Sequence, residues 1–262
     1  MTICVSPVPA WFTPGGASFW PIAGSEEGSL PCGKCIGCRT RQAMDWATRC
    51  HCESKLYEQN AFITLTYADE PPDGEAAVHD WKNFAKALRR RIGKFRYFAC
   101  TERGELHGRL HHHALIFGHD FLEPLKQRWL EDAWSSQKGA GFIDVAACEP
   151  ASINYVAGYT AKKLSEGVRD DLRMRASLSP PIGYDWLRLY HDDVERAGGV
   201  VIEGKLYPIP ALFVERNKHG FRHVRADARA YAASHTRSEL ALRARELRMK
   251  VKRREKMQVT KL

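Results

Sequence analysis

Hydrophobic positions along the chain recur with the short period of strands in some segments and the longer period of helices in others. The run at 62–67 is β-branched and aromatic and ends at an Asp-Glu-Pro-Pro stretch, which predicts a strand followed by a loop. In residues 78–93, large apolar residues share one face while lysines and arginines occupy the other positions. This pattern predicts an amphipathic helix with a basic outer side.

Further elements follow from the same patterns: helices at 40–58, 122–134 and 151–165, and strands at 95–101, 111–117 and 141–147. A polar, glycine-containing turn joins strands 95–101 and 111–117 into a hairpin. The order from residue 62 onward is therefore β-α-β-β-α-β-α. That order predicts an α+β fold in which helices flank an antiparallel sheet of about five strands.

The segments outside this core are less regular. Residues 1–31 are rich in proline and glycine, which predicts an irregular arm, and double prolines and glycines interrupt residues 176–220. From about residue 221 the chain is basic and rich in Ala, Leu and Arg, which predicts a helical tail. We therefore expect an N-terminal arm and Cys-rich segment at 1–55, a central domain at 56–175, an irregular extension at 176–220 and a basic tail at 221–262.

The charge balance favours a polyanionic partner, because 40 lysines and arginines face 31 acidic residues and give a net charge of +9. The predicted DNA contacts are the tail and the outer side of helix 78–93, with Lys82, Lys86, Arg89 and Arg90. A solvated basic surface is the alternative. No apolar run approaches the ~18 residues of a membrane span, and no secretory signal is visible, so we expect a cytoplasmic chain without a membrane partner.

Eight cysteines in a reducing compartment are more typical of thiols or metal ligands than of disulfides. Cys32, Cys35 and Cys38 lie close together in sequence and could hold a structural Zn²⁺. The fourth ligand of such a site would be Cys50, His51 or Cys52. Reduced cysteines without a metal are the alternative, since regular zinc motifs consist of two well-separated pairs.

Three consecutive histidines stand at the start of the strand at 111–117. Because side chains alternate along a strand, His111 and His113 point to one face and His112 to the other. Two histidines so placed can bind one divalent metal ion. Glu102, at the end of the preceding strand, would lie across the hairpin and supply a third ligand. A chance cluster of histidines is the alternative.

The helix at 151–165 carries two tyrosines one turn apart. At about 100° per residue, Tyr155, Tyr159 and Lys162 share one stripe, and a mostly apolar stripe lies away from it. The apolar stripe can supply the buried face, which leaves the tyrosines for chemistry. A tyrosine becomes a nucleophile when a metal polarises the phosphate that it attacks and an ammonium group stabilises the developing charge. Two partly buried structural tyrosines are the alternative.

These motifs together resemble those of a known family. The shared segments are Pro-Cys-Gly-Lys-Cys-Ile-Gly-Cys-Arg at 31–39, the strand at 62–67, Glu102, His-His-His-Ala-Leu-Ile-Phe-Gly at 111–118, and Tyr-Val-Ala-Gly-Tyr at 155–159 followed by Lys162 and Lys163. Over roughly residues 31–165 the chain resembles the replication initiation proteins of gokushoviruses, a branch of the microviruses, within the His-hydrophobe-His endonuclease superfamily. His112 replaces the hydrophobe of that motif.

The resemblance implies a ferredoxin- or RRM-like endonuclease fold for residues 56–175 and a metal-dependent enzyme of rolling-circle replication. Such an enzyme nicks one strand at the origin of the duplex replicative form, in the cytoplasm of the host bacterium. It stays attached to the 5′ end through a tyrosine, leaves a 3′ hydroxyl for the host replication machinery, and rejoins the strand later. The implied roles are Mg²⁺ or Mn²⁺ ligands for Glu102, His111 and His113, catalysis for Tyr155, Tyr159 and Lys162, and DNA contact for Lys163.

Two other functions stay open at this point. One is a non-catalytic DNA-binding regulator in which the histidines and cysteines hold structural zinc. The other is a hydrolytic metalloenzyme that uses metal-bound water and leaves no covalent adduct on DNA.

Overall fold

The computed structural model describes residues 4–13, 15–71, 73–104, 108–162, 173–217 and 221, with the backbone alone at 160–162 and 173. The helices are α1 (Ile36–Ser54), α2 (Gly74–Ile92), α3 (Pro124–Ser135), α4 (Pro150–Lys162), α5 (Tyr184–Ala197) and α6 (Ala211–Arg216). The strands are β1 (Val8–Thr13), β2 (Gly16–Ser18), β3 (Glu26–Leu30), β4 (Asn60–Tyr67), β5 (Arg96–Arg103), β6 (Leu110–Phe117), β7 (Ala140–Ala147), β8 (Arg173–Ala176), β9 (Val200–Ile202) and β10 (Lys205–Tyr207).

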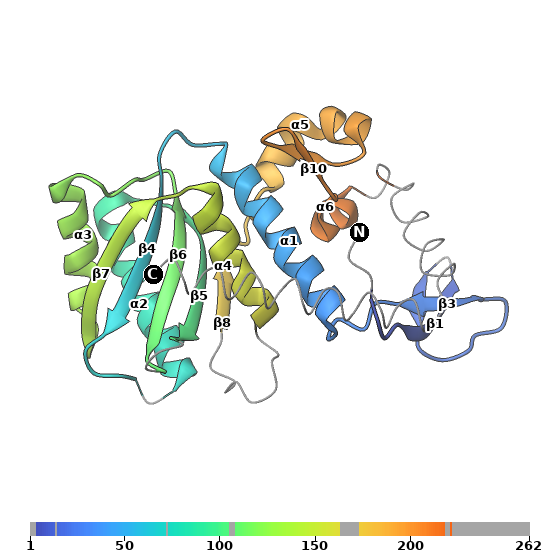
Figure 1. Ribbon diagram of the computed structural model, residues 1–262, viewed down its shortest axis with the longest axis horizontal. Coiled ribbons are helices and arrows are strands. Elements are labelled where there is room, and N and C mark those ends of the chain that lie inside the picture. Colours follow the sequence, from blue (N-terminus) through green and yellow to red (C-terminus); the bar gives the residue numbers. More distant parts are fainter. Residues whose placement is uncertain are drawn as a thin grey trace.

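The central sheet has five antiparallel strands in the order β7-β4-β6-β5-β8 (Figure 1). The predicted hairpin forms between β5 and β6, and helices flank the sheet, so the predicted α+β class is confirmed. Each helix and strand predicted between residues 40 and 165 is present, although α1 begins four residues earlier than the apolar spacing indicates. The edge strand β8 was not predicted, because its four residues carry too short a pattern.

One face of the sheet packs against α2 and α3. Alternate residues of β4, from Ala61 to Tyr67, point into this layer together with Ala114 and Ile116 of β6. Trp81 and Phe84 of α2 fill it from the helix side and are fully buried. Asp73 begins α2 with a side-chain cap on the amide of Ala76, as expected for an N-cap aspartate.

The opposite face of the sheet is covered only in part. Helix α4 packs on β5 and β6, with α1 alongside it (Figure 1), and this layer buries Phe98, Leu115, Ile153 and Val156. The outer strand β7 is left uncovered on this face, where Phe142 is 87% exposed. One half of the face is therefore core and the other half is an open surface.

Residues outside the central fold are more regular than the sequence predicts. The predicted irregular arm contains β1, β2 and β3, which form a small antiparallel sheet, and the predicted irregular extension contains α5, α6 and the hairpin β9–β10. These elements are short, so their periodicity is hidden among prolines and glycines. The extension packs on α1 through a cluster that includes Cys52, Leu187 and Phe213.

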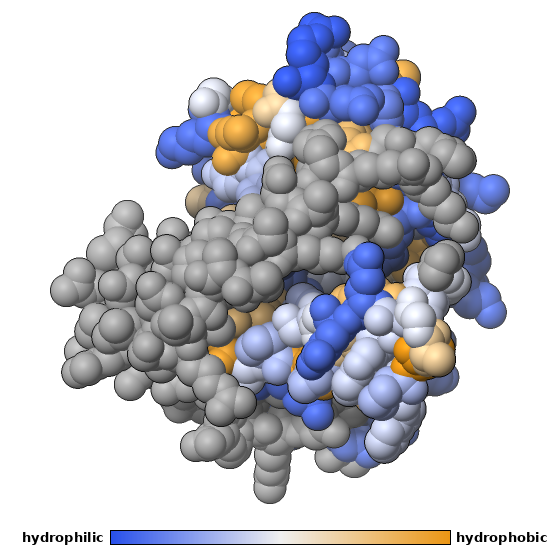
Figure 2. Space-filling model, turned by 90° about the vertical axis from the view of Figure 1, so that its right-hand side faces the viewer, coloured by the Kyte–Doolittle hydropathy of each residue, from blue (hydrophilic) through white to orange (hydrophobic). Residues whose placement is uncertain are grey.

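Gly183, at the start of α5, shows why this packing needs a glycine. Its φ is +79°, and an added Cβ would lie 2.8 Å from the carbonyl oxygen of Arg49. Seen from the end that carries β1 and β3, hydrophilic and small hydrophobic areas alternate over the described surface (Figure 2). Of the helices that the structure describes, none has the length and apolar character needed to cross a membrane.

Candidate active site

Strand pairing brings Glu102, His111 and His113 together on the partly covered face of the sheet. Glu102 is paired directly with His111 across the β5–β6 hairpin. The carboxylate Oε1 of Glu102 lies 3.0 Å from Nε2 of His111 and 3.4 Å from Nε2 of His113. One ligand atom from each residue lies within 4.8 Å of the other two. The geometry thus brings together the three residues that the sequence predicts as metal ligands.

The second nitrogen of each histidine ring is held from outside the cluster. Nδ1 of His111 is 3.1 Å from the backbone carbonyl of Arg109, and Nδ1 of His113 is 3.0 Å from the hydroxyl of Thr64. A metal-ligating histidine usually shares its other ring nitrogen in this way, which fixes the ring and its tautomer. Both Nε2 atoms are therefore aimed at one point beside the carboxylate.

The charge at this point suits a cation. Burial raises the pKa of Glu102, but hydrogen bonds from His111 and His113 outweigh it and bring the pKa down to about 2. The carboxylate is therefore ionised at neutral pH. Imidazole nitrogens together with a carboxylate oxygen form a donor set that fits Mn²⁺ and accommodates Mg²⁺.

His112 points into the opposite layer and has a structural role. It is fully buried, with Nε2 2.9 Å from the hydroxyl of Tyr67 and Nδ1 2.8 Å from the hydroxyl of Thr101. Burial and the nearby positive charge of Arg175 lower its pKa well below the usual value, so the ring is neutral. The position that a hydrophobe occupies in the superfamily motif is here a histidine whose polar atoms are both satisfied.

Helix α4 places both tyrosines against the histidines. The ring of His113 stacks on Tyr159 with centroids 5.5 Å apart, and its centroid is 5.3 Å from that of Tyr155. The two tyrosine rings meet edge to face at 4.9 Å. The hydroxyl of Tyr159 also hydrogen-bonds to Glu102, so the tyrosine stripe of α4 adjoins the candidate metal ligands.

The two tyrosines differ in burial. Tyr159 is 2% exposed, and burial together with the charge of Glu102 raises its pKa far above the usual value. Tyr155 is half-buried. The sequence prediction that the tyrosine stripe lies apart from the core is therefore wrong for Tyr159. The reason is that α4 is enclosed between the sheet and α1, so its apolar and tyrosine stripes are both covered.

The open half of the sheet face begins next to these residues. Thr66 pairs with His111, and its hydroxyl donates a hydrogen bond of 2.9 Å to the carbonyl of Phe142 on β7. Ile143 pairs with the inward-facing Leu65, so Phe142 and its alternate Asp144 point to the face that carries the histidines. Phe142 was not predicted as a site residue, although the alternation of strand 140–147 could have assigned it to this face.

The predicted DNA contacts on α2 are not brought to this site. Lys82, Lys86, Arg89 and Arg90 are exposed, but α2 covers the opposite face of the sheet. The guanidinium group of Arg89 also lies 5.0 Å from the ring centroid of Phe95, so this residue packs as well as carrying charge. The side chain of Lys162, Lys163 and the basic tail at 222–262 lie outside the described residues.

The cysteine cluster forms, but its fourth member differs from the prediction. Cys32, Cys35 and Cys38 group with Cys4 from the N-terminal segment. Cys50 and Cys52 lie further along α1 and are buried in two separate apolar clusters, while the cap region of α1 holds the other thiols. The predicted participation of Cys50, His51 or Cys52 is therefore wrong. A single cysteine far away in sequence left no spacing signal.

Comparison with known proteins gives consistent matches. Residues 60–164 match the family model of the replication-associated protein ORF2. The chain is 27% identical over 277 residues to Replication-associated protein VP4 of Bdellovibrio phage phiMH2K, covering 93% of this chain and 87% of the relative. It is 33% identical over 217 residues to Replication-associated protein ORF2 of Spiroplasma virus 4, covering 72% and 67%. A third relative, Replication-associated protein ORF4 of Chlamydia phage 1, is 27% identical, with 70% and 52% covered. No solved structure matches the chain.

Proposed function

The chain belongs to the replication-associated proteins of microvirus-type phages, and we propose that it initiates rolling-circle replication by nicking and rejoining one DNA strand through a tyrosine. One observation carries the proposal: two tyrosines on one helix lie against His113 of a converging Glu102-His111-His113 cluster. A carboxylate and two imidazoles can hold a divalent ion at a phosphate, and a tyrosine in reach can attack that phosphate. This combination is the one expected of a His-hydrophobe-His endonuclease.

Glu102, His111 and His113 would hold the ion, Mg²⁺ or Mn²⁺. When bound, it would polarise the scissile phosphate and offset the negative charge that develops there. The outer contacts of the histidines, to the carbonyl of Arg109 and the hydroxyl of Thr64, keep the ligand atoms in place.

The proposed attack leaves a covalent intermediate on the protein. The tyrosine oxygen forms a bond to phosphorus, the bond from phosphorus to the 3′ oxygen breaks, and the tyrosine proton leaves as the 3′ oxygen gains one. The 5′ phosphate stays on the tyrosine, and the 3′ hydroxyl is free for the host replication machinery in the bacterial cytoplasm. The reverse attack by a 3′ hydroxyl rejoins the strand.

The two tyrosines enter this cycle from different states. Tyr155 is half-buried, so its hydroxyl can meet a phosphate with little rearrangement. Tyr159 is held by its hydrogen bond to Glu102 and becomes available when that carboxylate is engaged by a cation. Lys162 ends the same helix and is proposed to stabilise the developing charge.

The DNA strand is proposed to cross the open half of the sheet face. Phe142 offers an exposed ring for base stacking on the same side as His111. Thr66 lies between them and is only partly buried. The basic residues of α2, with Lys163 and the tail, would add sequence-independent phosphate contacts.

The deciding experiment is to incubate the full chain with circular single-stranded DNA and Mn²⁺ and to look for a protein–DNA adduct that survives denaturation. We expect an adduct through a 5′ phosphate on tyrosine, and none in a His111→Ala, His113→Ala double variant. Cleavage without an adduct would favour hydrolysis by metal-bound water. Binding without cleavage would favour a non-catalytic regulator, and either result would overturn the proposal.

A further inference from the structure

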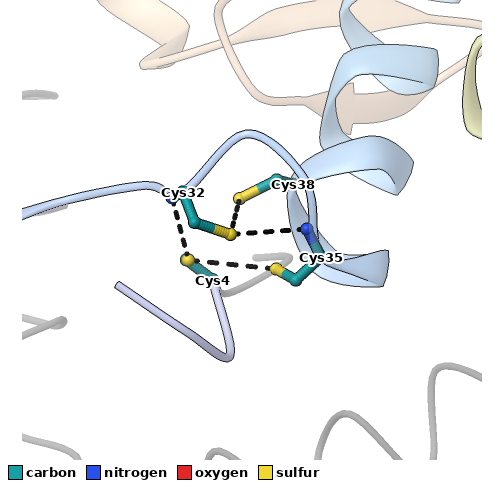
Figure 3. A group of neighbouring side chains, drawn as sticks. All are labelled: Cys4, Cys32, Cys35 and Cys38. Atoms are coloured by element: carbon teal, nitrogen blue, oxygen red, sulfur yellow. Dashed lines mark hydrogen bonds between the residues drawn. The ribbon is translucent and has the colours of Figure 1, made fainter. Parts of the chain in front are cut away.

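Four cysteine side chains converge at the start of α1 (Figure 3). Cys4 precedes β1, Cys32 follows β3, and Cys35 and Cys38 belong to the cap and first turn of α1. The sulfur atoms of Cys4 and Cys35 are 3.8 Å apart, and those of Cys32 and Cys38 are 4.0 Å apart. All four sulfurs lie within 4.8 Å of one another.

These distances fit a tetrahedral metal site better than disulfides. With Zn–S bonds of about 2.3 Å, the sulfurs of a tetrahedron lie roughly 3.8 Å apart. A disulfide needs about 2.05 Å, and all four cysteines are free thiols. Cys35 occupies the N-cap position of α1 without capping the helix by its side chain, because its sulfur is turned into the cluster.

The backbone around the sulfurs is arranged to stabilise thiolates. The amide of Val5 donates to Cys35 Sγ at 3.4 Å, and the amide of Cys32 donates to Cys4 Sγ at 3.3 Å. The amide of Cys35 donates to Cys32 Sγ at 3.3 Å, closing the Cys-Gly-Lys-Cys turn. That turn needs Gly33, whose φ is +72°, a conformation that other residues rarely adopt.

The surroundings of the cluster show what a metal would do there. In the small sheet formed by β1, β2 and β3, only Ala10 is fully buried. A sheet this small has too little core to hold itself in place, and such modules commonly depend on a metal or on disulfides. The cluster joins both ends of this sheet to the first turn of α1, and α1 packs along the tyrosine helix α4.

We propose that Cys4, Cys32, Cys35 and Cys38 bind one structural Zn²⁺ that fixes the N-terminal sheet to α1. Four thiols lose their protons to solvent on binding and leave a site with two net negative charges. Arg39 lies one turn into α1 within electrostatic reach of Cys32 and Cys35 and offsets part of that charge. The ion is zinc because four thiolates in a closed tetrahedron, with no open position, are typical of structural zinc sites.

The test is to measure bound zinc by elemental analysis after extensive dialysis, in a His111→Ala, His113→Ala background that removes the other candidate metal site. We expect about one zinc per chain there, loss of that zinc in added Cys4→Ser or Cys38→Ser variants, and retention in a Cys148→Ser control. Cys148 is a matched control because it is a half-buried thiol outside the cluster.

A second measurement uses the unmodified chain and so does not depend on variants that fold. A thiol reagent should label Cys148 but spare the four clustered cysteines until a zinc chelator is added, as read by mass mapping. Cobalt substituted for zinc should give the thiolate charge-transfer and intense visible bands of a tetrahedral site. Absence of zinc, iron in its place, retention of zinc in Cys4→Ser, or equal labelling of all five cysteines would overturn the proposal.

Discussion

Glu102 and His111 face each other directly across the β5–β6 hairpin, with the carboxylate Oε1 3.0 Å from the imidazole Nε2. Their separation in sequence is set by the turn, and their shared face is set by the pleat. His113 joins them two residues later on the same strand, whereas His112 between them serves the opposite layer. This division of labour within three consecutive histidines can be tested.

Replacing His111 or His113 with alanine should abolish metal-dependent nicking, because each substitution removes one of three converging ligands. Affinity for single-stranded DNA should change little, since phosphate contacts supply most of it. Cleavage of a labelled oligonucleotide with Mn²⁺ and fluorescence anisotropy without metal would separate the two effects. Wild-type nicking by the double variant would show that the ion binds elsewhere.

A His112→Leu variant should behave in the opposite way. It leaves the hydroxyls of Tyr67 and Thr101 buried without their histidine partner, which costs about 1–3 kcal/mol each in the free energy of unfolding. Below its denaturation midpoint the variant should still nick, because Nε2 of neither ligand histidine is affected. Urea denaturation measures the stability. A loss of Mn²⁺ affinity with unchanged stability would contradict this assignment.

Phe142 should contribute to strand binding through base stacking. Removal of the ring in Phe142→Ala should weaken single-stranded DNA binding by about 1–3 kcal/mol, or roughly 5- to 150-fold. Phe19→Ala is a matched control, because Phe19 is also an exposed phenylalanine, at 59%, but lies next to the N-terminal sheet. Equal affinities of the two variants would show that the strand does not cross β7.

The sequence predicts the central fold and the metal cluster well because both depend on local periodicity. Alternation along one strand separates His112 from its neighbours, and a single hairpin brings Glu102 to them. The burial of Tyr159 could not be predicted, because it depends on α1 closing over α4 from a distant part of the chain. The same holds for Cys4, which reaches the other cysteines only through the path of a three-stranded sheet.

The basic side of α2 should affect DNA affinity without affecting chemistry. Lys82, Lys86 and Arg90 are exposed on the face opposite the candidate site, so their replacement by alanine should leave the nicking rate of a short, saturating oligonucleotide unchanged. Affinity for long DNA should fall, and the dependence of log affinity on log salt should become shallower. Titrations at several salt concentrations give the slope. An unchanged slope would show that α2 is not on DNA.

The two-tyrosine mechanism makes the sharpest prediction. The rings of Tyr155 and Tyr159 meet at 4.9 Å and both contact His113, so either hydroxyl can approach the same phosphate in turn. Release of a genome circle needs a second attack while the first adduct persists. Each single phenylalanine variant should therefore form some adduct on an oligonucleotide but fail to circularise a full-length strand, and the double variant should form none.

The single variants should also differ from each other, because the two hydroxyls begin in different environments. Tyr159 is buried and bound to Glu102, so the adduct formed by Tyr155→Phe should require a higher Mn²⁺ concentration than the adduct formed by Tyr159→Phe. Tyr190→Phe, on the exposed side of α5, controls for the loss of a hydroxyl and should behave as wild type. Adduct yield on denaturing gels across a Mn²⁺ titration gives the comparison. Completion of the whole cycle at the normal rate by Tyr155→Phe would make Tyr155 a structural residue and leave Tyr159 as the sole nucleophile.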